Sequence, residues 1–344
     1  MAGFHRSESA AAEPPAGSEN CRVRRPDLDP PSAEALARGL ATVTTARGRR
    51  PSAAQVSVVE GFSRLLLGVD QPFAMPGCEP GELSVAITTE YEREFAAQLL
   101  VLSALVDEQP AHECRDACLA FSRALGQRPE NLAVLHDVVH RRIRRAHWHL
   151  YRRFLVDGLR TGSLSGDLEA VHDLVRERQD HPEIAEPYLA LEHLPEDTFG
   201  NHFFQFRMNR GFNFPGQKGA LPTAYGFELH DSMHVLSGYN TTSTDEINVV
   251  AFQAGASSTL PWLLIAVNLI TFNSGLPYGP VGLLHYEPER GRLDPDGFVR
   301  AFERGLGVRR DVSRDFDLMK AWQMPLEEVR EQLGIIGAGD VRKP

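Results

Sequence analysis

Two histidines four residues apart, followed at a set distance by a glutamate, constrain this chain more than any other feature of its sequence. His230, Asp231 and His234 lie in the segment HDSMH, and Glu246 follows His234 after eleven intervening residues. On a helix, residues four apart share one face with their Cβ atoms about 5–6 Å apart, so both imidazoles can reach one metal ion. Gly238 predicts the end of this helix, and Glu246 is expected in the first turn of the next.

The expected helices cover residues 222–237 and 245–257 and bring together His230, Asp231, His234 and Glu246. Asp231 lies about 100° round the helix from His230 and about 60° from His234, so it can be a third ligand or orient one. A second role is open for Glu246, because residues 243–246 match a capping box with Ser243 at the N-cap. Apolar residues beside the histidines predict a crevice with apolar walls: Tyr225, Phe227, Leu229, Met233, Val235 and Leu236.

A second HDxxH sequence offers a comparison within the same chain. It consists of His136, Asp137 and His140, and the position twelve residues after His140 is Arg152 where a carboxylate would be needed. Four more arginines crowd it, and positive charge opposes the binding of a divalent cation. We therefore expect a solvated basic helix face here and no metal site. Those arginines are Arg141, Arg142, Arg144 and Arg145.

Composition narrows the classes of function. The formal net charge of −10 argues against general nucleic-acid binding, which needs a basic surface. Four cysteines in 344 residues do not make a disulfide framework. Cys114 and Cys118 lie one helical turn apart, and we expect them to be small buried apolar residues. The longest apolar stretch, residues 260–270, is shorter than the roughly 20 residues that span a bilayer.

Apolar spacing predicts an all-α fold of two helical domains, because no strand-like alternation is long enough to indicate a sheet. Residues 1–52 are rich in Ala, Pro, Ser, Arg and Glu, and predict a disordered tail. Residues 53–160 predict a helical bundle, and residues 161–187 a connecting helix or linker. Residues 188–344 predict the helical domain that contains the histidine pair.

The pattern HDxxH-x11-E resembles the signature of the ubiquinone (coenzyme Q) biosynthesis protein four family. Other landmarks of that family flank it, and the resemblance covers about residues 188–336, roughly half of the chain. Residues 100–126 faintly resemble a tellurite-resistance TerB-like helical bundle. The landmarks are Thr198-Phe199-Gly200 with Phe203, Phe204 and Phe206, then Gly275-Leu276-Pro277, then Trp322, Pro325-Leu326 and Arg330 to Ile335.

The resemblance implies a function late in ubiquinone synthesis, on a polyprenylated aromatic ring. The family is associated with metal-dependent oxidative decarboxylation of that ring, with lipid binding and with a scaffold role at the inner membrane face. It implies that His230, Asp231, His234 and Glu246 are the metal ligands and catalytic residues, and their type favours zinc. The implied partners are a prenylated molecule or lipid and other quinone-biosynthesis proteins. We expect a homo-oligomer, a dimer, in the cytoplasm or peripherally on the membrane.

Two other functions stay open. An HD-type metal phosphohydrolase also has His-Asp on a helix, and it additionally needs an upstream histidine and a downstream aspartate. His193 or His202 and Asp294 or Asp296 are available for these positions. We favour the quinone-biosynthesis interpretation, because a phosphohydrolase explains neither the distant glutamate nor the ending of the chain. A non-catalytic lipid-binding scaffold that keeps the helix pair for stability is the second alternative.

Overall fold

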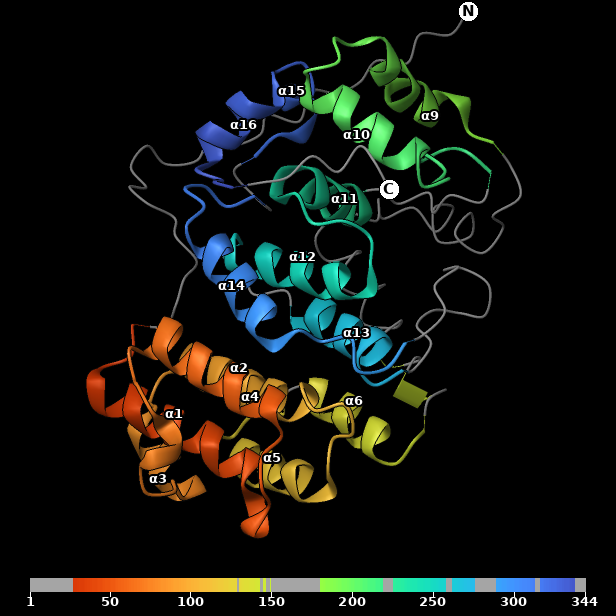
Figure 1. Cartoon of the computed structure of the whole chain (residues 1–344). Coiled ribbons are helices and arrows are strands. Elements are labelled where there is room, and N and C mark those ends of the chain that lie inside the picture. The colour runs from red at the N-terminus through yellow and green to blue at the C-terminus, as the bar shows by residue number, and fades with distance from the viewer. Residues whose placement is uncertain are drawn as a thin grey trace, which may run out of the picture.

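The structure is a computed structural model that describes residues 27–128, 130–142, 145–146, 149, 180–218, 225–257, 262–275, 289–312 and 316–337. Within these residues the regular elements are helices, and β-pairing is limited to the isolated bridges Thr198–Pro325 and Ser274–Arg290. The predicted all-α fold is confirmed. Figure 1 shows the first helices (red to yellow) gathered on one side of the molecule and the later ones (green to blue) on the other.

The first group of helices forms a bundle, and side-chain caps define where several of them begin. Asp29 accepts the backbone N–H of Ser32 at the start of α1, and capping boxes open α2 and α4. Such caps satisfy the backbone N–H groups that the first turn of a helix leaves unpaired. The bundle consists of α1 (Pro30–Thr44), α2 (Ala53–Phe62), α3 (Pro80–Ala86), α4 (Glu90–Leu105), α5 (His112–Ala124) and α6 (Glu130–Val139).

The predicted tail over residues 1–52 is wrong in its second half, where α1 is an integral part of the bundle. Leu36, Leu40 and Val43 on this helix are at most 1% exposed and join the main core. The composition of the segment suits a disordered chain, but its few large apolar residues recur at helical spacing and all face the other helices. Residues 1–26 lie outside the described part of the chain, so the prediction for them stays open.

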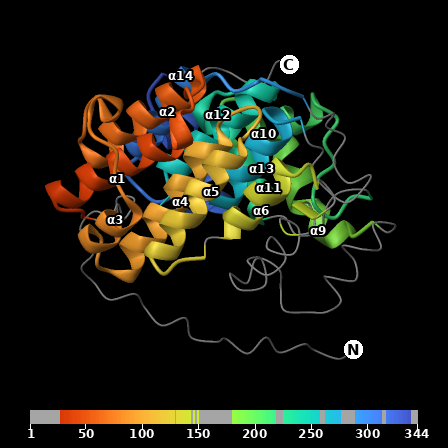
Figure 2. The ribbon, with the colours of Figure 1, turned by 90° about the horizontal axis from the view of Figure 1, so that it is seen from below.

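The later helices carry the histidine pair. In Figure 1, α12 lies between α11 and α14, and the view from below in Figure 2 shows α9, α10 and α11 on the side away from α1 and α3. The predicted linker over residues 161–187 falls mostly outside the described residues. This part consists of α9 (Pro182–Leu189), α10 (Phe199–Met208), α11 (Tyr225–Ser237), α12 (Ser243–Gly255), α13 (Trp262–Phe272), α14 (Pro295–Leu306), α15 (Leu318–Ala321) and α16 (Leu326–Leu333).

The two groups of helices share one continuous apolar core. Helix α14 packs on α2, and α13 packs on α4 and α6. The ring of Phe62 on α2 contacts the rings of Phe298 and Phe302 on α14, with centroids 5.8 and 4.8 Å apart. The Asn273 amide, just after α13, donates to the backbone oxygen of Val106 at 3.0 Å. The bundle therefore supports the helices that lie beneath the histidine pair.

Glycines allow α12 and α14 to touch backbone to backbone. A Cβ atom at Gly255 would collide with the backbone oxygen of Phe302, and one at Gly305 would collide with that of Phe252. Only glycine leaves room for so close a crossing. This contact holds α12, which carries Glu246, at a set distance from α14. Among the helices of the described ranges, none has both the length and the apolar character that a membrane span needs.

Replacing Leu36 by alanine is expected to lower the free energy of unfolding by about 2–5 kcal/mol, because a fully buried leucine leaves a cavity. Val85 is 79% exposed on α3, so Val85→Ala should change it by less than about 0.5 kcal/mol. Urea unfolding of both variants measures the difference. Equal small effects would show that α1 does not pack in this way.

Candidate metal centre

The turn between α11 and α12 begins at Gly238, as the sequence predicts, but the residue that caps α12 differs from the predicted one. Gly238 has a φ of 79°, and its N–H donates to the His234 oxygen, which ends α11. The next helix is capped by Thr242, whose hydroxyl accepts the N–H of Asp245 at 3.1 Å. The predicted capping box from Ser243 is therefore wrong. The N-cap lies one residue earlier than predicted, the helix begins at Ser243 rather than at residue 245, and the Glu246 carboxylate turns toward the histidines.

Three of the four predicted ligands converge. Oε2 of Glu246 lies 3.2 Å from Nε2 of His230 and 3.6 Å from Nε2 of His234. The two Nε2 atoms are 3.3 Å apart. One donor atom from each residue lies within 4.8 Å of the others, and among the described residues no other such group of three or more His, Cys, Asp and Glu occurs. His234 and Glu246 are buried, and the side chain of His230 is 14% exposed.

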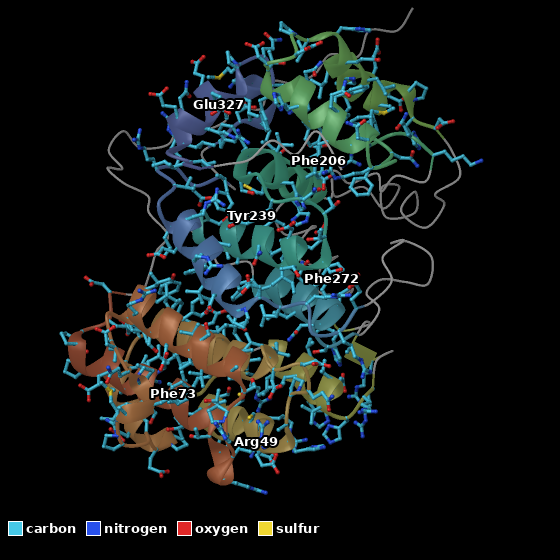
Figure 3. The ribbon with its side chains drawn as sticks, in the orientation of Figure 1. Arg49, Phe73, Phe206, Tyr239, Phe272 and Glu327 are labelled. Atoms are coloured by element: carbon cyan, nitrogen blue, oxygen red, sulfur yellow. The ribbon has the colours of Figure 1, made fainter. Side chains whose placement is uncertain are left out.

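The His234 imidazole is fixed by its surroundings. Its Nδ1 donates to the backbone oxygen of Tyr239 at 3.1 Å, since a carbonyl can only accept. In a neutral imidazole this bond would make Nε2, which faces Glu246, the nitrogen that can bind a metal. The ring of Phe206 stacks on the imidazole at 5.3 Å, and the Arg210 guanidinium lies 4.1 Å from the Phe206 ring centre. Figure 3 labels Phe206, which comes from α10, and Tyr239, which comes from the loop after α11.

Asp231 takes a different position from the one predicted for a ligand. Its carboxylate forms an ion pair with the Arg207 guanidinium, which also donates to the backbone oxygen of Asn213. Arg207 lies over the rings of Phe203 and Phe214, 5.9 and 5.4 Å from their centres. Asp231 is therefore not part of the three-residue cluster. Its negative charge still acts on His230, which agrees with the orienting role that the sequence left open.

Two arginines from distant parts of the chain hold the end of the histidine helix. Arg330 is buried and donates to the backbone oxygens of Val235 and Leu236, at 2.8 and 3.1 Å. Arg304 donates to the oxygen of Ser237 at 2.9 Å. Cations favour the carboxyl end of a helix, where carbonyls lack partners. Arg330 belongs to the sequence landmark near the chain end, but its contact with α11 was not foreseen.

The electrostatics of the cluster follow from burial and from mutual contact. Burial alone would lower the pKa of His230, but the hydrogen bond and charge of Glu246 outweigh it, so this pKa is raised above 6.5. Burial likewise favours the neutral form of Glu246, yet the two histidines hold the pKa of its carboxyl far below 4.5. Burial and the charge of Asp231 raise the pKa of Glu228 to about 7. Nothing in the sequence singles out Glu228.

Several predicted residues have other surroundings than expected. Leu229, Met233, Val235 and Leu236, predicted to wall a crevice, are buried in the core. The side chains of Tyr225 and Phe227 lie outside the described part of the chain, as do Leu276 and Pro277. Cys114 and Cys118 are fully buried, as predicted.

In the second HDxxH sequence an arginine lies where a metal would have to bind. Nη1 of Arg115 is 3.4 Å from Nδ1 of His136 and 3.3 Å from Nε2 of His140. The prediction of a solvated face is wrong, because Asp137 is buried and both histidines are half-buried against the bundle. The positive charge expected here is present, but it comes from α5 and not only from the neighbouring residues in the sequence.

Comparisons with known proteins add little to this site. No family model matches the chain, and the comparison with curated proteins found no match. A solved structure from Nostoc punctiforme PCC 73102, provisionally described as a ubiquinone biosynthesis protein, aligns with a TM-score of 0.30 and 17% identity. The alignment covers 73% of this chain and 100% of the other. At that level of similarity it supports no statement about this protein.

The ion pair within the cluster predicts a pH dependence for the metal-free protein. The raised pKa of His230 contributes stability that is complete below its unfolded value of 6.5 and is lost as the pH rises through the folded value. The lowered pKa of Glu246 contributes stability above 4.5. The free energy of unfolding should therefore fall between about pH 6 and pH 9 more steeply in the wild type than in Glu246→Gln. Urea unfolding at both pH values measures this, and parallel curves would contradict the pairing.

Proposed function

We propose that His230, His234 and Glu246 hold one divalent metal ion, and that this ion serves chemistry of the quinone-biosynthesis type on a carboxylated, prenylated aromatic ring. The observation that carries the proposal is the convergence of two imidazole nitrogens and one carboxylate oxygen at a buried position. Two nitrogens and one oxygen are a donor set typical of catalytic zinc, which leaves a fourth position for water or substrate.

The spacing of the donor atoms supports this assignment. Ligand atoms about 2.0–2.2 Å from one zinc ion at tetrahedral angles lie roughly 3.3–3.6 Å from one another. The three observed separations are 3.2, 3.3 and 3.6 Å. The hydrogen bond from His234 Nδ1 to Tyr239 also selects the tautomer that a metal at Nε2 requires. Both the distances and this hydrogen bond therefore suit a metal of this kind.

Each residue of the site has a distinct part in the proposed chemistry. A divalent ion supplies a Lewis acid that can bind a phenol or carboxylate oxygen of the substrate and offset developing negative charge. Glu246 supplies the one carboxylate that balances the site's positive charge. Arg207 holds the Asp231 carboxylate, which lies on the histidine helix itself, outside the cluster, so its charge reaches His230 without occupying a ligand position. The ring substrate, lipid binding, protein partners, dimer and peripheral membrane location are expectations from the sequence resemblance.

The geometry favours this proposal over a phosphohydrolase. That class takes its further ligands from an upstream histidine and a downstream aspartate, whereas here the carboxylate that joins the two histidines is that of Glu246. The pair between Asp231 and Arg207 does not separate the two functions, because both would use this aspartate as a ligand. Asp296 accepts a hydrogen bond from Ser57, and Asp294 pairs with Arg300. Neither His193 nor His202 belongs to the described cluster. A non-catalytic scaffold would have the same geometry, so only an activity measurement separates it from an enzyme.

The His234→Ala variant is expected to lose binding of one zinc ion per chain, because it removes a buried ligand. His140→Ala should bind zinc as the wild type does, since Arg115 already lies against His140. Asp231→Asn should also retain the ion. Equilibrium dialysis with elemental analysis measures the stoichiometry. Equal loss from His234→Ala and His140→Ala would contradict the choice between the two HDxxH sequences.

The wild-type chain is expected to restore quinone synthesis in a host that lacks its own enzyme for this step, whereas Glu246→Ala should fail. Glu303→Ala, an exposed glutamate on α14, is the matched control and should complement. Complementation by folded Glu246→Ala would indicate a scaffold. Failure of the wild type, combined with phosphate release from nucleotides that Asp231→Asn abolishes, would indicate the phosphohydrolase.

A further inference from the structure

Two buried polar atoms beside the metal centre lack a hydrogen-bond partner among the described residues. They are Nδ1 of His230 and Oε1 of Gln253. Gln253 is 6% exposed and lies seven residues after Glu246 on α12, which places both side chains on one face of that helix. Buried polar groups are nearly always paired, so two such atoms near one site need an explanation.

The two side chains are close neighbours. Gln253 shares with Glu246 the face of α12 that packs on α11, where Oε2 of Glu246 lies 3.2 Å from Nε2 of His230, and the Gln253 amide acts electrostatically on the same imidazole. The chemistry of the two atoms is complementary. An amide oxygen is an acceptor only, and an imidazole nitrogen that carries hydrogen is a donor.

Metal binding determines which nitrogen of His230 carries that hydrogen. An ion bound at Nε2 leaves Nδ1 as the protonated nitrogen, and metal-bound histidines almost always donate this N–H to an acceptor. His234 has such an acceptor in the Tyr239 backbone oxygen. Oε1 of Gln253 is a buried acceptor without a partner among the described residues, on the helix that faces His230.

We propose that Gln253 is a positioning residue of the metal centre, whose Oε1 accepts the Nδ1–H of His230 when a divalent ion binds at Nε2. The inference rests on the proposed metal site. The helix that provides Glu246 as a ligand would also provide the group that orients His230. The backbone oxygen of Tyr239, in the loop, would then fix the imidazole of His234. The amide oxygen of Gln253, on α12, would fix that of His230.

The same helix offers a matched control. Asn248 is also 6% exposed, and its Oδ1 also lacks a partner among the described residues. It lies two residues after Glu246, about 200° round the helix, and so points away from the histidines. Its amide nitrogen lies near Gly297 of α14. Asn248→Leu therefore removes a comparably buried amide without touching His230.

The test titrates zinc into the full chain, freed of metal by a chelator, in competition with a chromophoric chelator. Gln253→Leu is expected to weaken zinc binding about 10- to 100-fold, the usual effect of removing such a partner. Gln253→Glu keeps an acceptor oxygen and should bind zinc at least as tightly as the wild type. Asn248→Leu should leave the affinity unchanged.

A second measurement separates positioning from mere structural support. In ¹⁵N-labelled zinc protein, the Nδ1–H of His230 should give a slowly exchanging proton signal in the wild type and in Gln253→Glu, and should lose it in Gln253→Leu. A purely structural role would lower the thermal midpoint of the metal-free protein and leave this signal in place.

Two results would overturn the assignment. One is zinc binding by Gln253→Leu that equals the wild type with the Nδ1–H signal retained, and the other is an equal loss of affinity in Asn248→Leu. His234→Ala serves as the reference for the metal site itself. If the wild type binds zinc no better than His234→Ala, the proposed metal centre fails together with Gln253. If that difference stands and Gln253→Leu is unaffected, only the role of Gln253 fails.

Discussion

A buried negative charge, the carboxylate of Glu246, is the interaction on which the arrangement of the site depends. A charge without compensation is costly in a protein interior. Glu246 is 5% exposed, and its oxygen faces His230 and His234 at 3.2 and 3.6 Å. In the metal-free protein the raised pKa of His230 favours a proton on its imidazole, which offsets this charge, and a divalent ion at the same place would replace that proton. Metal affinity should then be coupled to pH, as expected when ligands must lose protons.

The surrounding contacts fix the positions of Glu246 and the two histidines relative to one another. Gly255 and Gly305 let α12 lie directly on α14, while Arg330 and Arg304 bind the last carbonyls of α11. Both helices of the site are therefore held by parts of the chain that follow them by fifty residues or more in the sequence. A site built on rigid helices with fixed ends requires little rearrangement when a ligand binds. The chain end thus contributes to the geometry of the site without supplying a ligand.

Sequence patterns predicted most of the helices and which residues share a side of each helix. They did not predict which residues of other helices contact those sides. The spacing of His230, His234 and Glu246 and the stop at Gly238 follow from helix periodicity, and the structure has them. Asp231 was misplaced because its partner Arg207 lies on another helix, 24 residues earlier. Helix α1 was missed because Ala- and Pro-rich composition suits both a tail and a small-residue helix. In each case the deciding contact is tertiary, and one sequence contains no direct record of it.

The two HDxxH sequences show how far such a motif depends on its neighbours. The pair His230 and His234 lies on α11, whereas His136 lies on α6 and His140 directly follows its end, and both sequences place two imidazoles one turn apart. At His230 and His234 the adjacent helix contributes a carboxylate, whereas at His136 and His140 it contributes the guanidinium of Arg115. A cation attracts carboxylates and repels guanidinium groups, so the helices packed alongside give the two copies opposite electrostatic character. The chemistry of the motif is therefore a property of the helix pair and not of the five-residue pattern.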